Sequence, residues 1–339
     1  MKDRDISAPT LEDVANRAGV STATVSRCLN APEIVVEKTR ARVMEAVKDL
    51  GYAPNFSARA LAAKRTHTIG AVIPTIENAI FAQGLQAFQE RLGQAGFMML
   101  VTSSSYDPDV EAEQIRALVA RGVDGILLIG HDRDREVYQF LKDRNVATLV
   151  TWAFRADRPS IGFDNRLAMR ALVERALDLG HRRIGVISAR QAGNDRARER
   201  VESLLDTAAE RGIDRDSIVV IETEYGIQQG AAAFDQFAER ANPPTLVICG
   251  NDVLAAGALR RAHERGMSVP SDVSITGFDD IELASLLTPR LTTVHVPHRA
   301  MGAAAAEALI AMSAGEWSGE SLCLPTEIRD GETLGPPRR

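Results

Sequence analysis

The sequence predicts an α/β protein, with a small helical head followed by two doubly wound parallel-sheet subdomains. Three observations lead to this prediction. Residues 10–50 show the apolar periodicity of short helices separated by glycines. From residue 67 onward, strands rich in Val, Ile and Leu alternate with amphipathic helices, and this alternation restarts once, after residue 163. A chain of 339 residues is also too long for one ordinary domain.

The head opens with residues 10–30, TLEDVANRAGVSTATVSRCLN, which predict two short helices joined by a tight turn. Thr10 can cap the first helix with Asp13 as its capping-box partner, and Gly19 can end it with a positive φ. Ser21 can cap the second helix. Its inner side chains are then Val25, Cys28 and Leu29, and its outer ones are Thr22, Ala23, Ser26 and Arg27.

This pattern is typical of a helix-turn-helix DNA-binding head, whose second helix enters the major groove. Arg27 can bind guanine through O6 and N7, while short hydroxyls and backbone amides can hold phosphates. An ordinary antiparallel helix pair is the alternative, but it would more often show Glu/Lys ladders on this face. The candidate DNA contacts in the head are Thr10, Leu11, Ser21, Thr22, Ala23, Thr24, Ser26, Arg27 and Asn30.

The spelling DVA-x-x-AGVS-x-x-TVSR-x-LN resembles the start of the LacI (lactose/galactose repressor) family of bacterial transcription regulators. The resemblance covers essentially the whole chain, through VDGILL, GFDNRLAM, LGHRRIGVIS, GNDVLAAGAL and VPSDVSITGFDD. It implies core subdomains of periplasmic-binding-protein type, a homodimer on a near-palindromic operator, and control by a small effector. The expected function is that of a repressor; a regulator that needs its ligand as corepressor is the alternative. No leucine-heptad tail for tetramer formation is expected.

A third helix is expected at residues 37–50, where the family has a serine cap and this chain has Val36, so its first turn is expected to fray. A short helix follows, which Asn55 can cap. The resemblance implies a hinge helix that pairs with its dimer mate in the minor groove, with Leu61 as a wedge between base pairs, Ala62 beside it and Arg59 on phosphate. A connecting helix packed on its own domain is the alternative.

The expected domains are a head at 1–54, a hinge at 55–66 and an effector-binding and dimerisation core at 67–335. Subdomain one would comprise 67–164 with 297–322, and subdomain two 165–296 with 323–335. The expected strands are 68–73, 97–102, 125–129 and 147–151, then 183–187, 218–222, 245–249 and 273–277, all buried on both faces. Helices are expected between them and at 299–311, and one last strand near 321–329.

Composition and the distribution of charge along the chain indicate a DNA-binding protein, and the absence of catalytic motifs argues against an enzyme. Residues 1–65 carry 11 Lys and Arg against 8 Asp and Glu, a charge of +3, while the remainder carries 29 against 38, a charge of −9. A mildly basic head on an acidic body is typical of a specific DNA binder. Three scattered cysteines, no signal segment and no membrane-span run predict a cytoplasmic protein. Neither phosphate-loop nor nucleophile motifs occur, so an enzyme, a cofactor and a metal are not expected. A solute-binding protein is the remaining alternative.

The ligand is expected in the cleft between the subdomains, because open α/β sheets bind ligands beyond the carboxyl ends of their strands. Aromatic faces and Asp, Asn and Arg side chains there suit a sugar or sugar acid. This rule predicts ligand contacts in both subdomains. In the first they are Phe81, Tyr106 and Trp152, and in the second Asn194, Arg196, Tyr225, Asn251 and Asp279. The resemblance matches Asn251, Asp279 and Arg200 to ligand-contacting positions, and Phe81 and Tyr225 to aromatic positions that line the pocket.

Several assignments stay open at this point. Asp164 could contact the ligand or lock the junction between the subdomains. His131 and His298 could be contacts or ordinary cleft-edge residues, and Asp280 is expected to cap a helix. Arg196 and Arg200 lie one turn apart on a helix, so they predict either an acidic ligand or pairing with Asp195 or Glu199.

Overall fold

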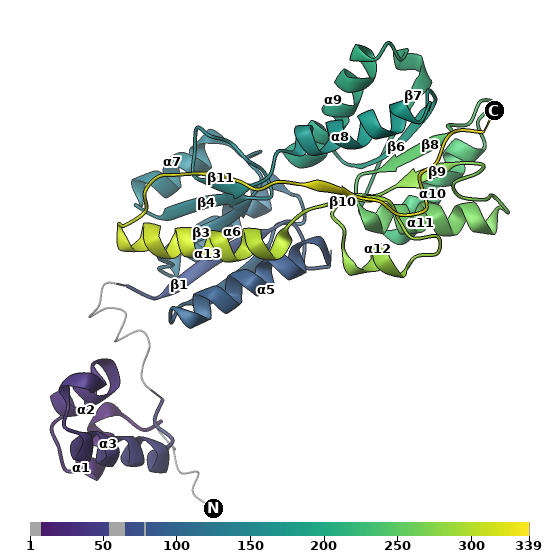
Figure 1. Ribbon diagram of the computed structural model, residues 1–339. Helices are drawn as coiled ribbons and strands as arrows, with labels where there is room; N and C mark the ends of the chain where they lie inside the picture. The colour runs from purple at the N-terminus through teal and green to yellow at the C-terminus, as the bar shows by residue number, and fades with distance from the viewer. Residues whose placement is uncertain (1–7, 54–64, 78, 339) are drawn as a thin grey trace, which may run out of the picture. The chain divides into compact units, whose positions relative to one another are not determined.

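A computed structural model describes residues 8–53, 65–77 and 79–338 of the chain. The chain divides into two compact units, Met1–Thr66 and His67–Arg339 (Figure 1). The first unit contains the predicted helices as α1 (Leu11–Ala18), α2 (Thr22–Asn30) and α3 (Glu37–Leu50). A short 3-10 turn, Pro32–Ile34, joins α2 to α3.

The local signals in the head are confirmed. The Thr10 hydroxyl accepts from the Asp13 amide at 3.3 Å, and the Asp13 carboxylate accepts from the Thr10 amide at 2.8 Å. Gly19 ends α1 with a φ of 61°, and the Ser21 hydroxyl caps α2 by accepting from the Thr24 amide at 3.2 Å. The α3 helix begins at Glu37 without a side-chain cap at Val36. The buried side chains that join the three helices are Val14, Ala15, Ala18, Val25, Cys28, Val43 and Ala46.

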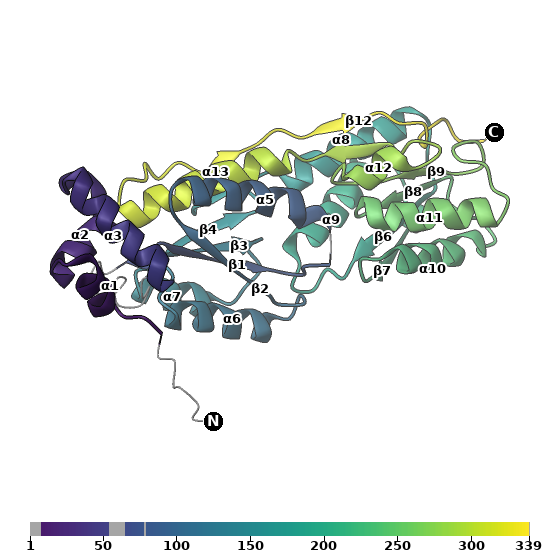
Figure 2. The same cartoon turned by 90° about the horizontal axis from the view of Figure 1, so that it is seen from below.

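The first subdomain of the second unit is a parallel sheet with the strand order β11-β5-β4-β3-β1-β2. Its strands are β1 (Thr68–Ile73), β2 (Met98–Ser103), β3 (Gly125–Ile129), β4 (Ala147–Thr151), β5 (Ser160–Gly162) and β11 (Leu322–Cys323). One face is covered by α5 (Ala79–Gln94) and α13 (His298–Ala314), and the other by α6 (Pro108–Ala120) and α7 (Arg135–Asp143), as Figure 2 shows.

The second subdomain is a parallel sheet with the strand order β7-β6-β8-β9. Its strands are β6 (Ile184–Ala189), β7 (Ile218–Thr223), β8 (Leu246–Cys249) and β9 (Ser274–Thr276). On one side α8 (Asn165–Asp178) packs on α9 (Asp195–Glu210), and on the other α10 (Ile227–Ala238) packs on α11 (Asp252–Glu264). The short helix α12 (Glu282–Leu286) follows β9. The α/β fold class with two doubly wound parallel sheets is therefore confirmed.

Two predictions about strands are wrong. The single last strand is two strands, because β11 joins the first sheet beside β5 while β12 (Glu327–Arg329) pairs antiparallel with β10 (Thr293–His295). Pro325 lies between them, where it cannot donate to a ladder. The expectation that every strand is buried on both faces fails for β2, where Met98 is 60% exposed, and for β7, where Glu222 is exposed. Both strands are at the edge of their sheets, so one side of each has no neighbouring strand.

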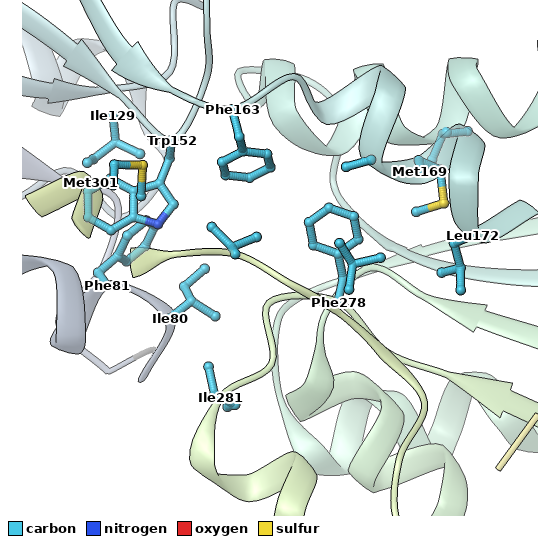
Figure 3. Packing of buried hydrophobic residues seen from close by; sticks show 14 of the residues in the cluster. Ile80, Phe81, Ile129, Trp152, Phe163, Met169, Leu172, Phe278, Ile281 and Met301 are labelled. Atoms are coloured by element: carbon cyan, nitrogen blue, oxygen red, sulfur yellow. The ribbon is translucent and has the colours of Figure 1, made fainter. Parts of the chain in front are cut away.

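The two sheets share one hydrophobic core. The chain passes between them at three places: from β5 to α8, from β10 to α13 and from β11 to β12 (Figure 1). Figure 3 shows Phe163 of the first subdomain beside Phe278 of the second, with their ring centroids 6.1 Å apart. The same cluster extends to Ile80 and Met301 on one side and to Leu172 on the other. The second unit therefore behaves as two layered bodies joined by continuous apolar packing.

The contact between α5 and α13 gives a test of this packing. A Cβ added at Gly302 would lie 1.9 Å from the backbone oxygen of Gly84, so Gly302→Ala must push the helices apart. We expect it to lower the free energy of unfolding by roughly 1–3 kcal/mol, as overpacking usually does. The matched control is Gly93→Ala in α5, where no atom lies within 4 Å and alanine should stabilise by up to about 1 kcal/mol. Urea unfolding midpoints measure both; equal midpoints would contradict the close packing.

Candidate functional site

The outer face of α2 is accessible in the head. Ser21, Thr22, Ala23 and Arg27 are exposed, and the guanidinium of Arg27 has no ion pair within the described part of the chain. Thr24 and Ser26, also predicted contacts, are half-buried. Their hydroxyls bond within the head, to the Ser21 hydroxyl at 2.9 Å and to the Asn30 amide at 3.2 Å. Thr10 is exposed, whereas Leu11 is half-buried and packs on the head core.

The predicted contacts of the hinge are Asn55, Arg59, Leu61 and Ala62. These four residues lie outside the described residues, and their roles stay predictions.

The first subdomain contributes aromatic side chains to the junction between the sheets. Phe81, at the start of α5, packs edge-on against Trp152, which follows β4, with ring centroids 5.3 Å apart (Figure 3). The imidazole of His298 also lies near this pair, with its centroid 6.1 Å from that of the Trp152 ring. Phe81 and Trp152 are each only 2% exposed. The predicted aromatic wall therefore exists, and it is closed to solvent.

The second subdomain contributes polar side chains that face this wall. The Arg200 guanidinium donates to the backbone oxygens of Arg196 at 3.1 Å and Gly250 at 2.9 Å. Its central carbon lies 4.3 Å from the ring centroid of Phe278. Asn251 caps α11, since its Oδ1 accepts from the Leu254 amide at 2.9 Å. Asp279 is buried and holds a backbone φ of 99°.

Buried polar atoms gather at this junction without partners. Among the described residues, Trp152 Nε1, Asn251 Nδ2, Asp279 Oδ2 and His298 Nδ1 are buried and make no hydrogen bond. Each such atom costs about 1–3 kcal/mol unless a partner is supplied. Burial also raises the pKa of Asp279, and the charge of Arg200 only partly offsets that effect. A hydroxyl group both donates and accepts, so hydroxyl groups of a bound molecule are suitable partners for atoms of this kind.

Contacts between the subdomains close the cleft, some of them through predicted residues and others, such as Arg198 and Asp132, through residues that were not predicted. The rings of Tyr106 and Tyr225 lie 6.0 Å apart, and Arg198 pairs with Asp132 at 2.8 Å. The carboxylate of Asp195 accepts from the His131 amide at 2.5 Å. It also pairs with Arg196 at 2.8 Å, so the intramolecular interpretation holds for that arginine. Burial acts to raise the pKa of Asp195, but the charge of Arg196 and the His131 amide outweigh it and hold that pKa below its usual value.

Three acidic or amide residues have structural contacts. Asp164 is exposed and caps α8, accepting from the Leu167 amide at 2.9 Å, and Asn194 caps α9. The prediction that Asp280 caps a helix is wrong, because α12 begins after Ile281 without a side-chain cap. The Asp280 carboxylate instead pairs with His295 at 2.8 Å, and Arg329 lies 3.8 Å away. The antiparallel pair β10–β12 brings these two residues to it, and that pairing was not predicted.

Phe163 and Phe278 belong to the site and are absent from the predicted set. Each stands directly before an aspartate, in the segments Gly162–Asp164 and Gly277–Asp279, both spelled GFD. Both segments follow the carboxyl end of a strand, β5 and β9. This repeated spelling is the sequence signal that could have identified them.

Comparison with known proteins agrees with this architecture. The family model described as bacterial regulatory proteins, lacI family, matches residues 10–55, and the model of a periplasmic binding protein-like domain matches residues 173–334. The transcriptional regulator DegA of Bacillus subtilis is 33% identical over 299 residues, which cover 87% of this chain and 88% of DegA. The chain belongs to the lacI family of bacterial regulatory proteins.

Two further relatives support the same assignment of this lacI-family chain. The transcriptional repressor PurR of Proteus mirabilis is 34% identical over 304 residues, covering 86% of this chain and 87% of PurR. A crystal structure of the lac repressor dimer, bound to operator and the anti-inducer ONPF, has a TM-score of 0.85. Its identity is 28%, and the match covers 97% of this chain and 100% of that one.

As a member of the lacI family, the protein is a DNA-binding transcriptional regulator controlled by a small-molecule effector, and it is not an enzyme. None of the described helices is long and apolar enough to cross a membrane. Within the same residues, no group of three side chains could hold a metal ion.

The buried carboxyl group of Asp279 is predicted to lower the stability of the ligand-free protein. Asp279→Asn removes a buried charge, so the ligand-free protein should gain roughly 1–3 kcal/mol of unfolding free energy at pH 7. Because its pKa is raised in the folded state, the wild-type stability should fall as pH rises from about 4 through the folded pKa. The difference between variant and wild type should therefore grow over that interval and then stay constant.

Thermal unfolding at a series of pH values measures this difference. The control is Asp143→Asn on the exposed end of α7, which should follow the wild type at every pH. A stability difference for Asp279→Asn that shrinks with rising pH would contradict the assignment.

Proposed function

We propose that this regulator binds a near-palindromic operator as a homodimer, and that a sugar or sugar acid bound between its core subdomains controls that binding. The observation that carries the proposal is the set of four unpartnered buried polar atoms on Trp152, Asn251, Asp279 and His298. They face a junction that joins both sheets, so a molecule bound there contacts both subdomains. The homodimer and the operator are proposed by analogy with the lac repressor, whose dimer was solved bound to operator.

The proposed domains are the head at 1–54, the hinge at 55–66 and the core at 67–335. The division of the chain after Thr66 and the two separate parallel sheets support this arrangement. In the core, subdomain one would comprise 67–164 with 297–322 and subdomain two 165–296 with 323–335. The return of the chain through α13 and β11 into the first sheet supports the second segment of subdomain one.

The proposed mechanism uses the closed cleft as one of two states. A ligand can shift an equilibrium only by its difference in affinity between the states. In the closed state the cleft offers hydrogen-bond partners from both subdomains, which an open cleft would separate. A ligand that satisfies them therefore favours closure, and the change in the angle between the subdomains biases the hinge and so the affinity for operator.

Arg27 is proposed to read a base directly. It is exposed on α2 and unpaired within the described residues, so its guanidinium is available for a guanine. We expect Arg27→Ala to cost roughly 1–3 kcal/mol of specific binding and to remove base preference at one position of each half-site. The matched control is Arg27→Lys, which keeps the positive charge but not the two parallel N–H donors of the guanidinium. It should therefore lose base preference at that position with a smaller loss of affinity. Selection from a randomised operator library measures both; an unchanged consensus would place the contact elsewhere.

The charge of the effector depends on Arg200. Because Asp195 neutralises Arg196, Arg200 is the arginine left for an acidic group, and its Nη2 makes no hydrogen bond within the described part of the chain. If the effector is a sugar acid, calorimetry should show tighter binding of the acid than of its neutral counterpart. Arg200→Gln should then weaken binding of the acid at least tenfold and binding of the neutral sugar much less. Tight binding of a neutral sugar, undiminished in the variant, would exclude an acidic effector.

A further inference from the structure

A groove that lies mainly on the first subdomain, and that meets the effector cleft at His131 and Asp195, collects positive charge. It is lined by β4 residues Ala147, Thr148 and Val150, by α7, by the segment 155–159 between β4 and β5, and at one end by α9. We call it the α7 groove; its volume is about 1040 Å³, at the upper limit of small-molecule pockets. Its cationic side chains are Arg133, Arg135, Lys142, Arg155, Arg158 and Arg198.

Within the described residues, two of these cations have a close ion pair. Arg133 pairs with Glu111 at 3.0 Å and Arg198 with Asp132 at 2.8 Å. Arg135, Lys142 and Arg155 have no ion pair within the described residues.

Arg158 is also poorly paired. Its nearest carboxylate oxygen, on Asp157, lies 3.9 Å from Nε, and this buried Nε makes no hydrogen bond. Three carboxylates, Asp132, Asp157 and Asp195, also line the groove, so its six cations exceed its acids by three. In a chain of net charge −6, this excess of positive charge indicates an anionic occupant.

A buried imidazole at the α9 end of the groove points to the same conclusion. His131 is 6% exposed, and neither of its ring nitrogens has a hydrogen-bond partner among the described residues. Burial, with the charges of Arg155 and Arg158, lowers the pKa of His131 to about 4 against the opposing effect of Asp195. At neutral pH the ring therefore offers one N–H donor and one acceptor, without a charge of its own.

Part of the groove is apolar, which favours an organic molecule over a bare ion. The guanidinium of Arg158 stacks over the Tyr138 ring at 4.8 Å, and Leu141, Val150 and Met312 are among the lining residues, together with the polar Asn145 and Thr148. We propose that the α7 groove is a second ligand site, which binds a small phosphomonoester with its phosphate between His131, Arg155 and Arg158. Phosphate oxygens accept the hydrogen bonds that these side chains have free, and arginine forks match their geometry.

Calorimetric titration of the full chain with phenyl phosphate tests this proposal. We expect Arg155→Gln/Arg158→Gln to weaken binding at least tenfold. The matched control is Arg175→Gln/Arg211→Gln, which removes the same charge from exposed ion pairs of the second subdomain and should bind within twofold of wild type. Arg200→Gln, in the effector cleft, should also leave phenyl phosphate binding unchanged. Inorganic phosphate should bind more weakly than phenyl phosphate, and benzyl alcohol should not bind.

The outcomes separate this site from the effector cleft. Loss of binding in Arg200→Gln would place phenyl phosphate in the cleft and overturn the second site, whatever the effector is. Equal affinities for inorganic and phenyl phosphate would overturn an organic ligand. Binding of oligoglutamate in preference to phenyl phosphate would assign the groove to an acidic protein segment instead and would also overturn the proposal.

Discussion

The packing of Phe163 on Phe278 is the interaction on which the rest of the core depends. Both rings are buried, and each comes from the end of a strand in a different sheet. The contact therefore joins the two sheets at the point where the chain first crosses between them (Figure 3). Because Arg200 stacks on Phe278, the same ring fixes the main cation of the candidate effector site. Apolar packing thus sets the geometry in which the polar groups of the cleft meet.

Polar contacts close the cleft around this apolar junction, and they differ in how well they are satisfied. Asp195 has both the Arg196 guanidinium and the His131 amide, so its charge is compensated where it is buried. Asp279 has neither a bonded Oδ2 nor a paired cation within ordinary ion-pair distance among the described residues. In the proposed mechanism, one carboxylate would therefore stabilise closure without a ligand, whereas the other would make closure costly until a ligand binds. This difference is what a ligand-controlled equilibrium requires.

Local signals in the sequence were sufficient to predict much of the fold. The Thr10–Asp13 capping box and the glycine at position 19 fix the ends of α1 through contacts only three or four residues apart. Most strands of the two sheets were also predictable, because burial on both faces requires continuous apolar runs. The three-residue strand β5 was not predicted, because it is too short to show such a run. The split of β11 from β12 was not, since it depends on which distant strand each half meets. The role of Asp280 was missed for the same reason, because its partners His295 and Arg329 come from that pairing.

The backbone carries a further mark of the cleft that side-chain patterns could not reveal. Five non-glycine residues that follow strand ends at the junction have positive φ: Ser105, Tyr106, Trp152, Asp279 and Asp280. Bulky residues such as Tyr106 and Trp152 rarely adopt this conformation, and each instance costs about 1–3 kcal/mol. Surrounding packing must offset that cost, which the burial of Trp152 against Phe81 and His298 does. Positive φ occurs at the predicted contacts Tyr106, Trp152 and Asp279, and two of these, Trp152 and Asp279, also carry unpartnered buried polar atoms, so both features support the proposed cleft.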